Sequence, residues 1–130
     1  MAKRAFLDTH IALWLASGDP KLSKALVKDI NNSSETAVSA VSIAELEIKA
    51  SAGKLRLPAE FEEAFREAGI KIEPFGIDAA LQFQRFPALA KHDPFDRMIL
   101  AQASAKSNTV LFTADRVIAS LGLDWVRDCS

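Results

Sequence analysis

The sequence predicts an α/β fold in which a mostly parallel sheet carries helices on both of its faces. Short apolar runs, such as residues 5–7 and 110–112, recur between stretches with helical periodicity, and an aspartate closely follows each of these two runs. Continuous apolar runs are typical of strands that are buried on both faces, and their alternation with helices predicts βαβ units. No repeat or linker interrupts the chain, so we expect residues 1–130 to form one domain.

The composition is that of a soluble globular protein, with 49% hydrophobic and 25% charged residues. It indicates neither disorder nor a membrane span. The formal charge of −1 means that a nucleic-acid partner would need a local basic patch or bridging metal ions. The single cysteine, Cys129, suits a reducing compartment, and we expect it to be exposed and incidental.

The N-terminus begins with the basic residues Lys3 and Arg4, as a secretory signal would. Asp8 and His10 interrupt the apolar segment that follows, and no small-residue cleavage site comes after it. We therefore expect a cytoplasmic protein that starts with its first core strand.

The first half of the chain alternates two strands with three helices. Ser23 is a favoured N-cap, and Gly53 lies where helices usually end. The expected elements are a strand at 5–7, a helix from Ile11 to the breakers at 17–20, a helix opening at Ser23 and ending at 31–34, a strand at 36–39 and a helix from Ser42 through Ala52.

The second half continues the alternation. Phe61 and Phe65 lie one helical turn apart, which predicts a helix with one buried side. The expected elements are a helix at 60–66, a strand at 70–72, a helix capped by Asp78 that bears Leu81, Phe83 and Phe86, a long helix from Pro94 towards Lys106, a strand at 110–112, a helix at 117–121 and a short strand at 125–126.

Three aspartates lie at the start of predicted helices. Asp8 and Asp115 come between a strand and a helix, where aspartate is a common N-cap, and Asp96 complements the dipole in the first turn of its helix. Asp93 is the better cap of that last helix, because it precedes Pro94. Asp96 is therefore freer to take part in chemistry.

Glu45 is the fourth candidate acid. It precedes Lys49 by four residues, so an exposed helical ion pair is an equally good interpretation. The neighbouring Ile43, Leu46 and Ile48 make the helix apolar around much of its circumference. A polar stripe on such a helix favours the wall of a cleft.

Together these four acids make physical sense as a metal site. Converging carboxylates repel one another and would take up protons unless a cation neutralised them. Ligation by oxygen selects Mg²⁺ or Mn²⁺, ions that promote phosphoryl chemistry. No glycine-rich phosphate loop or Cys/His zinc spacing is present. We expect structural or surface roles for His10 and His92, although His92 borders the cluster.

Five segments resemble, in their order along nearly the whole chain, a PIN-domain protein of the VapC toxin type. They are residues 6–10 (FLDTH), 41–45 (VSIAE), 53–55 (GKL), 92–97 (HDPFDR) and 112–115 (FTAD). The resemblance implies a PIN-like three-layer α/β/α sandwich and endoribonuclease activity that depends on Mg²⁺ or Mn²⁺. It also implies a homodimer and inhibition by a cognate VapB-type antitoxin encoded alongside.

The resemblance places the catalytic and metal-binding acids of that family on Asp8, Glu45, Asp96 and Asp115. Asp8, Asp96 and Glu45 would hold the principal metal, and Asp115 would support it or a second ion. The supporting hydroxyls fall on Thr9 and Thr113. Ala44 departs from the pattern, since relatives with the HDPFDR-type segment often carry a bulky aromatic residue there.

Three basic residues are adjacent to these acids or one helical turn away and could contact RNA phosphates: Lys49, Arg97 and Arg116. For Lys49 and Arg97, ion pairing with the same acids is an equally good interpretation.

Two other interpretations have different functional consequences. The chain could be a PIN-like binding or regulatory module without turnover, although such a module has no need to keep all four acids. It could also be a receiver or a haloacid-dehalogenase-type phosphatase. The phosphatase requires a second aspartate two residues after the nucleophile, and His10 occupies that position after Asp8.

Overall fold

The computed structural model describes residues 2–130 and contains one five-stranded sheet in the order β3-β2-β1-β4-β5. Every neighbouring pair of strands is parallel. The strands are β1 (Arg4–Leu7), β2 (Thr36–Ser39), β3 (Lys71–Glu73), β4 (Thr109–Thr113) and β5 (Val126–Asp128). The predicted α/β class is confirmed, and the sheet is more regular than expected because all of its strands are parallel.

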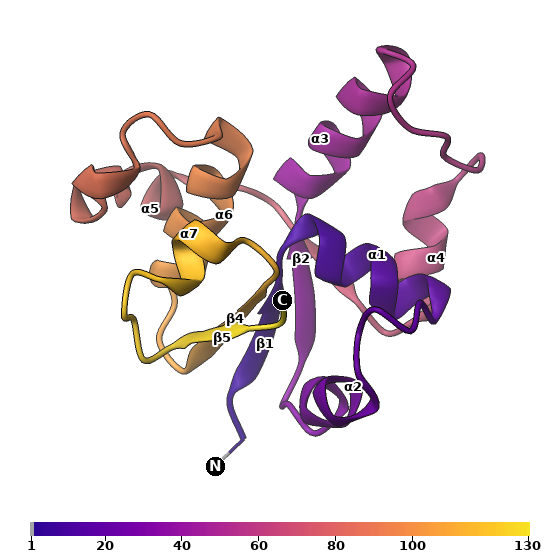
Figure 1. The fold of residues 1–130 in the computed structure, drawn as a ribbon, viewed down its shortest axis with the longest axis horizontal. Coiled ribbons are helices and arrows are strands. Elements are labelled where there is room, and N and C mark those ends of the chain that lie inside the picture. The colour runs from indigo at the N-terminus through magenta and orange to yellow at the C-terminus, as the bar shows by residue number, and fades with distance from the viewer. Residues whose placement is uncertain (1) are drawn as a thin grey trace.

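Helices cover both faces of the sheet and give three layers (Figure 1). The α-helices are α1 (Thr9–Ser17), α2 (Lys24–Asn31), α3 (Ala40–Ser51), α4 (Phe61–Glu67), α5 (Ile77–Ala80), α6 (Pro94–Ser104) and α7 (Arg116–Ala119), and two short 3₁₀ turns are η1 (Phe83–Arg85) and η2 (Pro87–Leu89). In Figure 1, α1, α2 and α4 lie on one side and α5, α6 and α7 on the other, while α3 extends past the end of the sheet. Among residues 2–130, no helix has the length and apolar character needed to cross a membrane.

Each face of the sheet has its own apolar core. Because side chains alternate along a strand, Phe6 points into one core and Leu7 into the other. Leu7 packs with Ile11 of α1 and Phe65 of α4, and Phe6 packs with Ile99 of α6. Two-sided burial explains why β1 is a continuous apolar run in the sequence.

The direction in which successive strands are added to the sheet changes at β1. The chain builds β2 and β3 on one side of β1 and then crosses to place β4 on the other side. Leu7 pairs with both Val38 and Phe112, so Asp8 leaves the sheet at the level where β2 and β4 also end. Open α/β sheets bind ligands at such a switch point, outside the carboxyl ends of the strands.

The start of α3 differs from the prediction. The helix begins at Ala40, two residues before the expected Ser42, because the Ser39 hydroxyl accepts a hydrogen bond from Val41 N at 3.0 Å. Ser39 therefore serves both as the last residue of β2 and as the helix cap. Ser42 lies in the first turn of the helix and is fully buried.

The predicted helix after Asp78 is wrong in its extent and its cap. The N-cap is Gly76, the helix ends at Ala80, and Asp78 Oδ1 accepts from the adjacent Ala79 N at 2.9 Å. Leu81 is 71% exposed, so the apolar residues that follow do not form one buried helical face. The 3₁₀ turns η1 and η2 carry the chain onward instead.

The expectation that Cys129 is exposed is also wrong. Its side chain is buried in the core beside Leu7 and Phe112, and its N–H donates to the Thr113 carbonyl at 2.8 Å. Burial raises the pKa of the Cys129 thiol to about 12. The thiol is therefore a packing group and is unreactive near neutral pH.

Candidate active site

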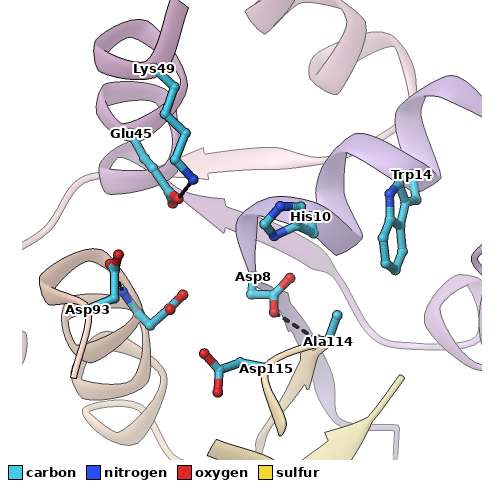
Figure 2. Close-up of a pocket in the computed structure, with 9 residues that line it drawn as sticks. Asp8, His10, Trp14, Glu45, Lys49, Asp93, Ala114 and Asp115 are labelled. Carbon is cyan, nitrogen blue, oxygen red and sulfur yellow. Dashed lines mark hydrogen bonds and ion pairs between the residues drawn. The ribbon is translucent and has the colours of Figure 1, made fainter. Parts of the chain in front are cut away.

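A cleft of about 330 Å³ opens at the carboxyl ends of β1 and β4 (Figure 2). All four acids singled out in the sequence line it. A lysine, two aromatic rings, a further aspartate and an alanine from the loop after β4 complete its lining. The lining residues are Asp8, His10, Trp14, Glu45, Lys49, Asp93, Asp96, Ala114 and Asp115.

Asp8 is held by three hydrogen bonds. Its Oδ1 accepts from Ile11 N at 3.0 Å and so caps α1, as the ordinary interpretation of the sequence required. Its Oδ2 accepts from the Thr113 hydroxyl at 2.6 Å and from Ala114 N at 2.9 Å. Burial raises the pKa of Asp8, and the hydrogen bonds from Thr113 and Ile11 oppose this effect. The carboxylate therefore has one fixed orientation.

Glu45 is buried on the wall that α3 contributes. Its Oε1 accepts from the Thr9 hydroxyl at 2.7 Å, and Thr9 Oγ1 lies 2.8 Å from Ser42 Oγ. Its Oε2 lies 2.6 Å from Lys49 Nζ, and this hydrogen bond raises the pKa of Lys49. The ion pair that the sequence offered as an alternative is present, and both of its partners line the cleft.

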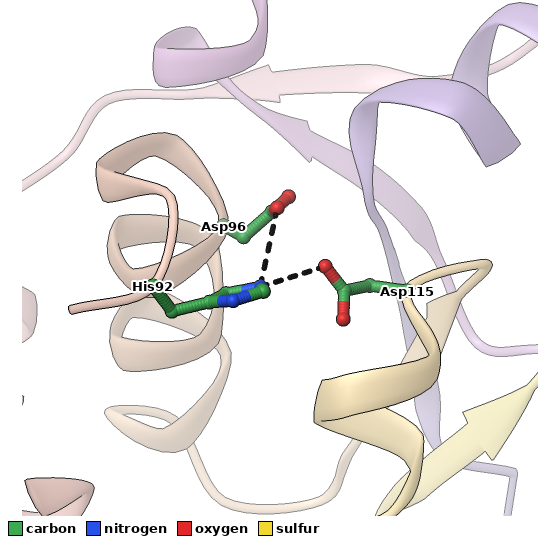
Figure 3. A group of neighbouring side chains, drawn as sticks. All are labelled: His92, Asp96 and Asp115. Carbon is green, nitrogen blue, oxygen red and sulfur yellow. Dashed lines mark hydrogen bonds and ion pairs between the residues drawn. The ribbon is translucent and has the colours of Figure 1, made fainter. Parts of the chain in front are cut away.

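Asp96 and Asp115 face each other across His92 (Figure 3). His92 Nε2 lies 2.9 Å from Asp115 Oδ2 and 3.6 Å from Asp96 Oδ2. Asp115 Oδ1 accepts from Ile118 N at 3.0 Å and caps α7. Asp93 caps α6 by accepting from Phe95 N at 2.8 Å, which leaves Asp96 in the first turn without a capping role.

Negative charge is crowded at the Asp96 carboxyl. Burial and the hydrogen bond with Asp115 raise the pKa of Asp96 to about 7, and the charges of Asp93 and Glu45 add to the effect. Burial acts in the same direction on Asp115, but hydrogen bonds from Ile118 N, His92 and Asp96 outweigh it and lower the pKa of Asp115. Of the two carboxyls, Asp96 is therefore the one that binds a proton more readily.

Of the three predicted phosphate contacts, only Lys49 lines the cleft. Arg97 donates to the Ala90 carbonyl at 3.3 Å, and its guanidinium lies 5.4 Å from the centre of the Phe83 ring. Arg116 is exposed at the start of α7 and is not among the lining residues. Adjacent residues on a helix point about 100° apart, so sequence proximity to an acid did not place these side chains beside it.

Sequence reasoning missed four residues of the site or gave them lesser roles. His10 and Trp14 line the cleft from α1, Asp93 lines it from the cap of α6, and His92 bridges two acids. A helical signal was available for α1, since His10 precedes Trp14 by four residues, whereas His92 lies in the loop before α6.

The side chains of the cleft fit a hard divalent cation. His92, Asp96 and Asp115 each offer a donor atom, and these atoms lie within 4.8 Å of one another. Asp8 and Glu45 add carboxylates to the same cleft. Carboxylate oxygens are the ligands that Mg²⁺ and Mn²⁺ prefer, and a cation would offset the burial and the neighbouring negative charges that raise the pKa of Asp96.

The fold is similar to that of chains in toxin–antitoxin complexes. A chain of the DNA-bound VapBC complex from Salmonella typhimurium has a TM-score of 0.67 and 18% identity, with 98% of this chain and 99% of that chain covered. A chain of a toxin–antitoxin complex from Klebsiella pneumoniae has a TM-score of 0.66 and 23% identity, with 97% and 98% covered. A chain of VapBC-1 from nontypeable Haemophilus influenzae has a TM-score of 0.61 and 22% identity, with 96% and 97% covered.

No curated protein is significantly similar in sequence. The family model of the PIN domain matches residues 5–122, which include all four acids of the cleft. The chain therefore belongs to the PIN domain family.

Proposed function

We propose that this chain is a metal-dependent endoribonuclease and the toxin of a type II toxin–antitoxin pair. The observation that carries the proposal is the convergence of Asp8, Glu45, Asp96 and Asp115 on one cleft at the switch point of the sheet. Membership of the PIN family supports nuclease chemistry, and the similarity of its fold to chains of VapBC complexes supports the toxin role.

In this proposal Asp8, Glu45 and Asp96 hold Mg²⁺ or Mn²⁺, and Asp115 supports that ion or a second one. Such an ion polarises a phosphoryl oxygen and lowers the pKa of a bound water. Thr113 and the N–H groups of Ile11 and Ala114 orient Asp8 for this task. Residues behind the ligands commonly set the orientation on which metal affinity depends.

The remaining polar groups have separate tasks. Thr9 fixes Glu45 through its hydroxyl, and Lys49 offers the positive charge in the cleft for a substrate phosphate. His92 Nε2 lies between Asp96 and Asp115 and would help to position both carboxyls beside the ion.

The proposed partners follow from the toxin role. We propose that the whole chain, residues 1–130, is a single PIN domain that works in the cytoplasm as a homodimer. A cognate VapB-type antitoxin would inhibit its RNA cleavage while the two proteins are bound. The similar structures described above come from VapBC and toxin–antitoxin complexes, which supports the antitoxin partner.

A cleavage assay on a mixed pool of labelled structured RNAs tests the function. The purified chain is incubated with Mg²⁺ or Mn²⁺ and, in parallel, with EDTA. Asp8→Asn serves as the inactive variant. Asp124→Asn, which changes an exposed acid that does not line the cleft, serves as the charge control. We expect metal-dependent cuts with the wild type and the control only.

Two results would contradict the proposal. Full metal-dependent cleavage by Asp8→Asn would remove Asp8 from the reaction and point to a contaminating nuclease. Binding of metal and RNA without any cleavage, after denaturation and refolding to remove a retained antitoxin, would favour a PIN-like binding or regulatory module without turnover.

A further inference from the structure

Two aromatic rings extend the acidic cleft along α1. His10 and Trp14 both line the cleft that contains the acids, and their ring centres lie 6.1 Å apart with planes inclined by 50° (Figure 2). They follow Asp8 by two and six residues, so at about 1.5 Å per residue they lie roughly 3 and 9 Å further along the helix axis. The rings thus form one side of the cleft, next to the acids.

Neither ring forms a hydrogen bond in the described part of the chain, and Trp14 packs one part of its surface against the core on its side of the sheet. Within residues 2–130, no hydrogen bond is formed by the His10 ring, which is exposed, or by Trp14 Nε1. Trp14 is only partly buried. Among residues 2–130, every fully buried side-chain nitrogen or oxygen has a hydrogen-bond partner, and Trp14 Nε1 has none. The indole N–H therefore reaches solvent.

Positive charge lies beside the outer ring. Lys21 Nζ is 5.9 Å from the centre of the Trp14 ring, and Lys49 lines the same cleft from α3. The exposed His10 ring, the half-buried Trp14 ring and the nearby lysines combine the two features that bind single-stranded nucleic acid. Bases stack on the rings, and phosphates contact the cations.

We propose that His10 and Trp14 form a stacking platform for one or two unpaired bases next to the scissile phosphate. The inference rests on the proposed ribonuclease function and adds the kind of substrate, an RNA segment whose bases are splayed out of a helix. Such unpaired bases are the usual targets of sequence-specific RNA recognition, and stacking on aromatic side chains is how proteins hold them. The platform explains why a cleft that holds four carboxylates can still retain a polyanion.

A fluorescence titration tests the platform without requiring cleavage. The chain has two tryptophans, and Trp125 packs against Phe86 in the core on the opposite face of the sheet. Trp125→Phe therefore leaves Trp14 as the sole reporter. The variant is titrated with 12-mers of uridylate or adenylate, with Ca²⁺ in place of Mg²⁺, and with a 12-mer of abasic ribose phosphates that has the same charge.

We expect the base-bearing oligomers to quench Trp14 emission and the abasic oligomer to leave it unchanged. Base-bearing oligomers that leave the emission unchanged would overturn the proposal. Quenching that depends on bases, found in a chain that cleaves no RNA, would keep the platform and reject the ribonuclease.

Kinetics on a cleaved RNA give the second test. Removing one stacking ring should raise KM about tenfold and leave kcat within about twofold, because stacking on the flanking base binds substrate and transition state alike. Trp14→Ala and His10→Ala test the two rings, and Trp14→Phe keeps an aromatic face as the matched control.

An unchanged KM in Trp14→Ala would overturn the platform while the ribonuclease stands. Loss of antitoxin binding in Trp14→Ala, with RNA binding intact, would assign the rings to a protein partner instead.

Discussion

Asp96→Asn should make the metal-free protein more stable above neutral pH. The pKa of Asp96 in the folded state is about 7, against 3.8 for the unperturbed group. Because the folded state holds the proton more tightly than the unfolded chain, the stability of the wild type falls as pH rises from about 4 to 7 and then stays low. An asparagine keeps the shape of the side chain and never acquires the charge, so the variant escapes this loss.

The size of the effect follows from the pKa shift. At about 1.4 kcal/mol per unit, the change from 3.8 to about 7 corresponds to about 4 kcal/mol. The Asp96 side chain is 27% exposed, and the lowered pKa of Asp115 returns part of that energy. We therefore expect a gain of about 1 to 2 kcal/mol at pH 8, or roughly 4 to 8 °C in Tm for a domain of this size.

Urea unfolding in EDTA at pH 4 and pH 8 measures the gain. The difference in unfolding free energy between Asp96→Asn and wild type should be larger at pH 8, and Asp124→Asn should show no such dependence. Added Mg²⁺ should reverse the order at pH 8, because the proposed cation stabilises the wild type and binds the variant less well. A difference that is equal at both pH values would refute the idea that burial and the neighbouring acids make ionisation of Asp96 costly.

Three further predictions concern the same molecule. Thr113→Val removes the hydroxyl that donates to Asp8 and should weaken Mg²⁺ binding about 10- to 100-fold by calorimetry, while Thr113→Ser should not. Glu73→Ala leaves the buried Arg4 without its closest acidic partner and should cost about 3 kcal/mol in urea unfolding, with Mg²⁺ affinity unchanged. Mg²⁺ affinity should rise with pH up to about 7 as Asp96 loses its proton, and calorimetry in two buffers of different ionisation enthalpy should detect that proton; a flat profile would contradict it.

The strand-end acids were predictable because a simple geometric rule connects sequence to space. Parallel strands end at one edge, so Asp8 and Asp115 must lie near each other once both preceding runs are recognised as strands. Glu45 required a second step, the recognition that a polar stripe on a largely buried helix faces a cleft. Asp96 joined the group because Asp93 before Pro94 is the better cap of its helix, and the PIN resemblance then marked the same four acids.

Two features that the sequence did not indicate have an equally physical origin. Arg97 and Arg116 are adjacent in sequence to Asp96 and Asp115 but do not line the cleft, because the helix turns by about 100° per residue; their contact with RNA phosphates outside the cleft stays a prediction. Cys129 looked exposed because it is next to the last residue, although pairing of β5 with β4 brings it over the core. Position in the chain therefore decided less than position in the sheet.

Capping and site geometry are one arrangement in this fold. Asp8 Oδ1 caps α1 while Oδ2 is fixed by Thr113 and Ala114, and Asp115 Oδ1 caps α7 while Oδ2 faces His92. A carboxylate has about four lone pairs, so these bonds orient each acid and still leave acceptor capacity. Asparagine caps a helix about as well as aspartate, whereas alanine does not. Asp8→Asn should therefore keep the cap of α1 and remove the charge, at the cost of the acceptor that faces Ala114 N, which makes it a sharper test of the chemistry than Asp8→Ala.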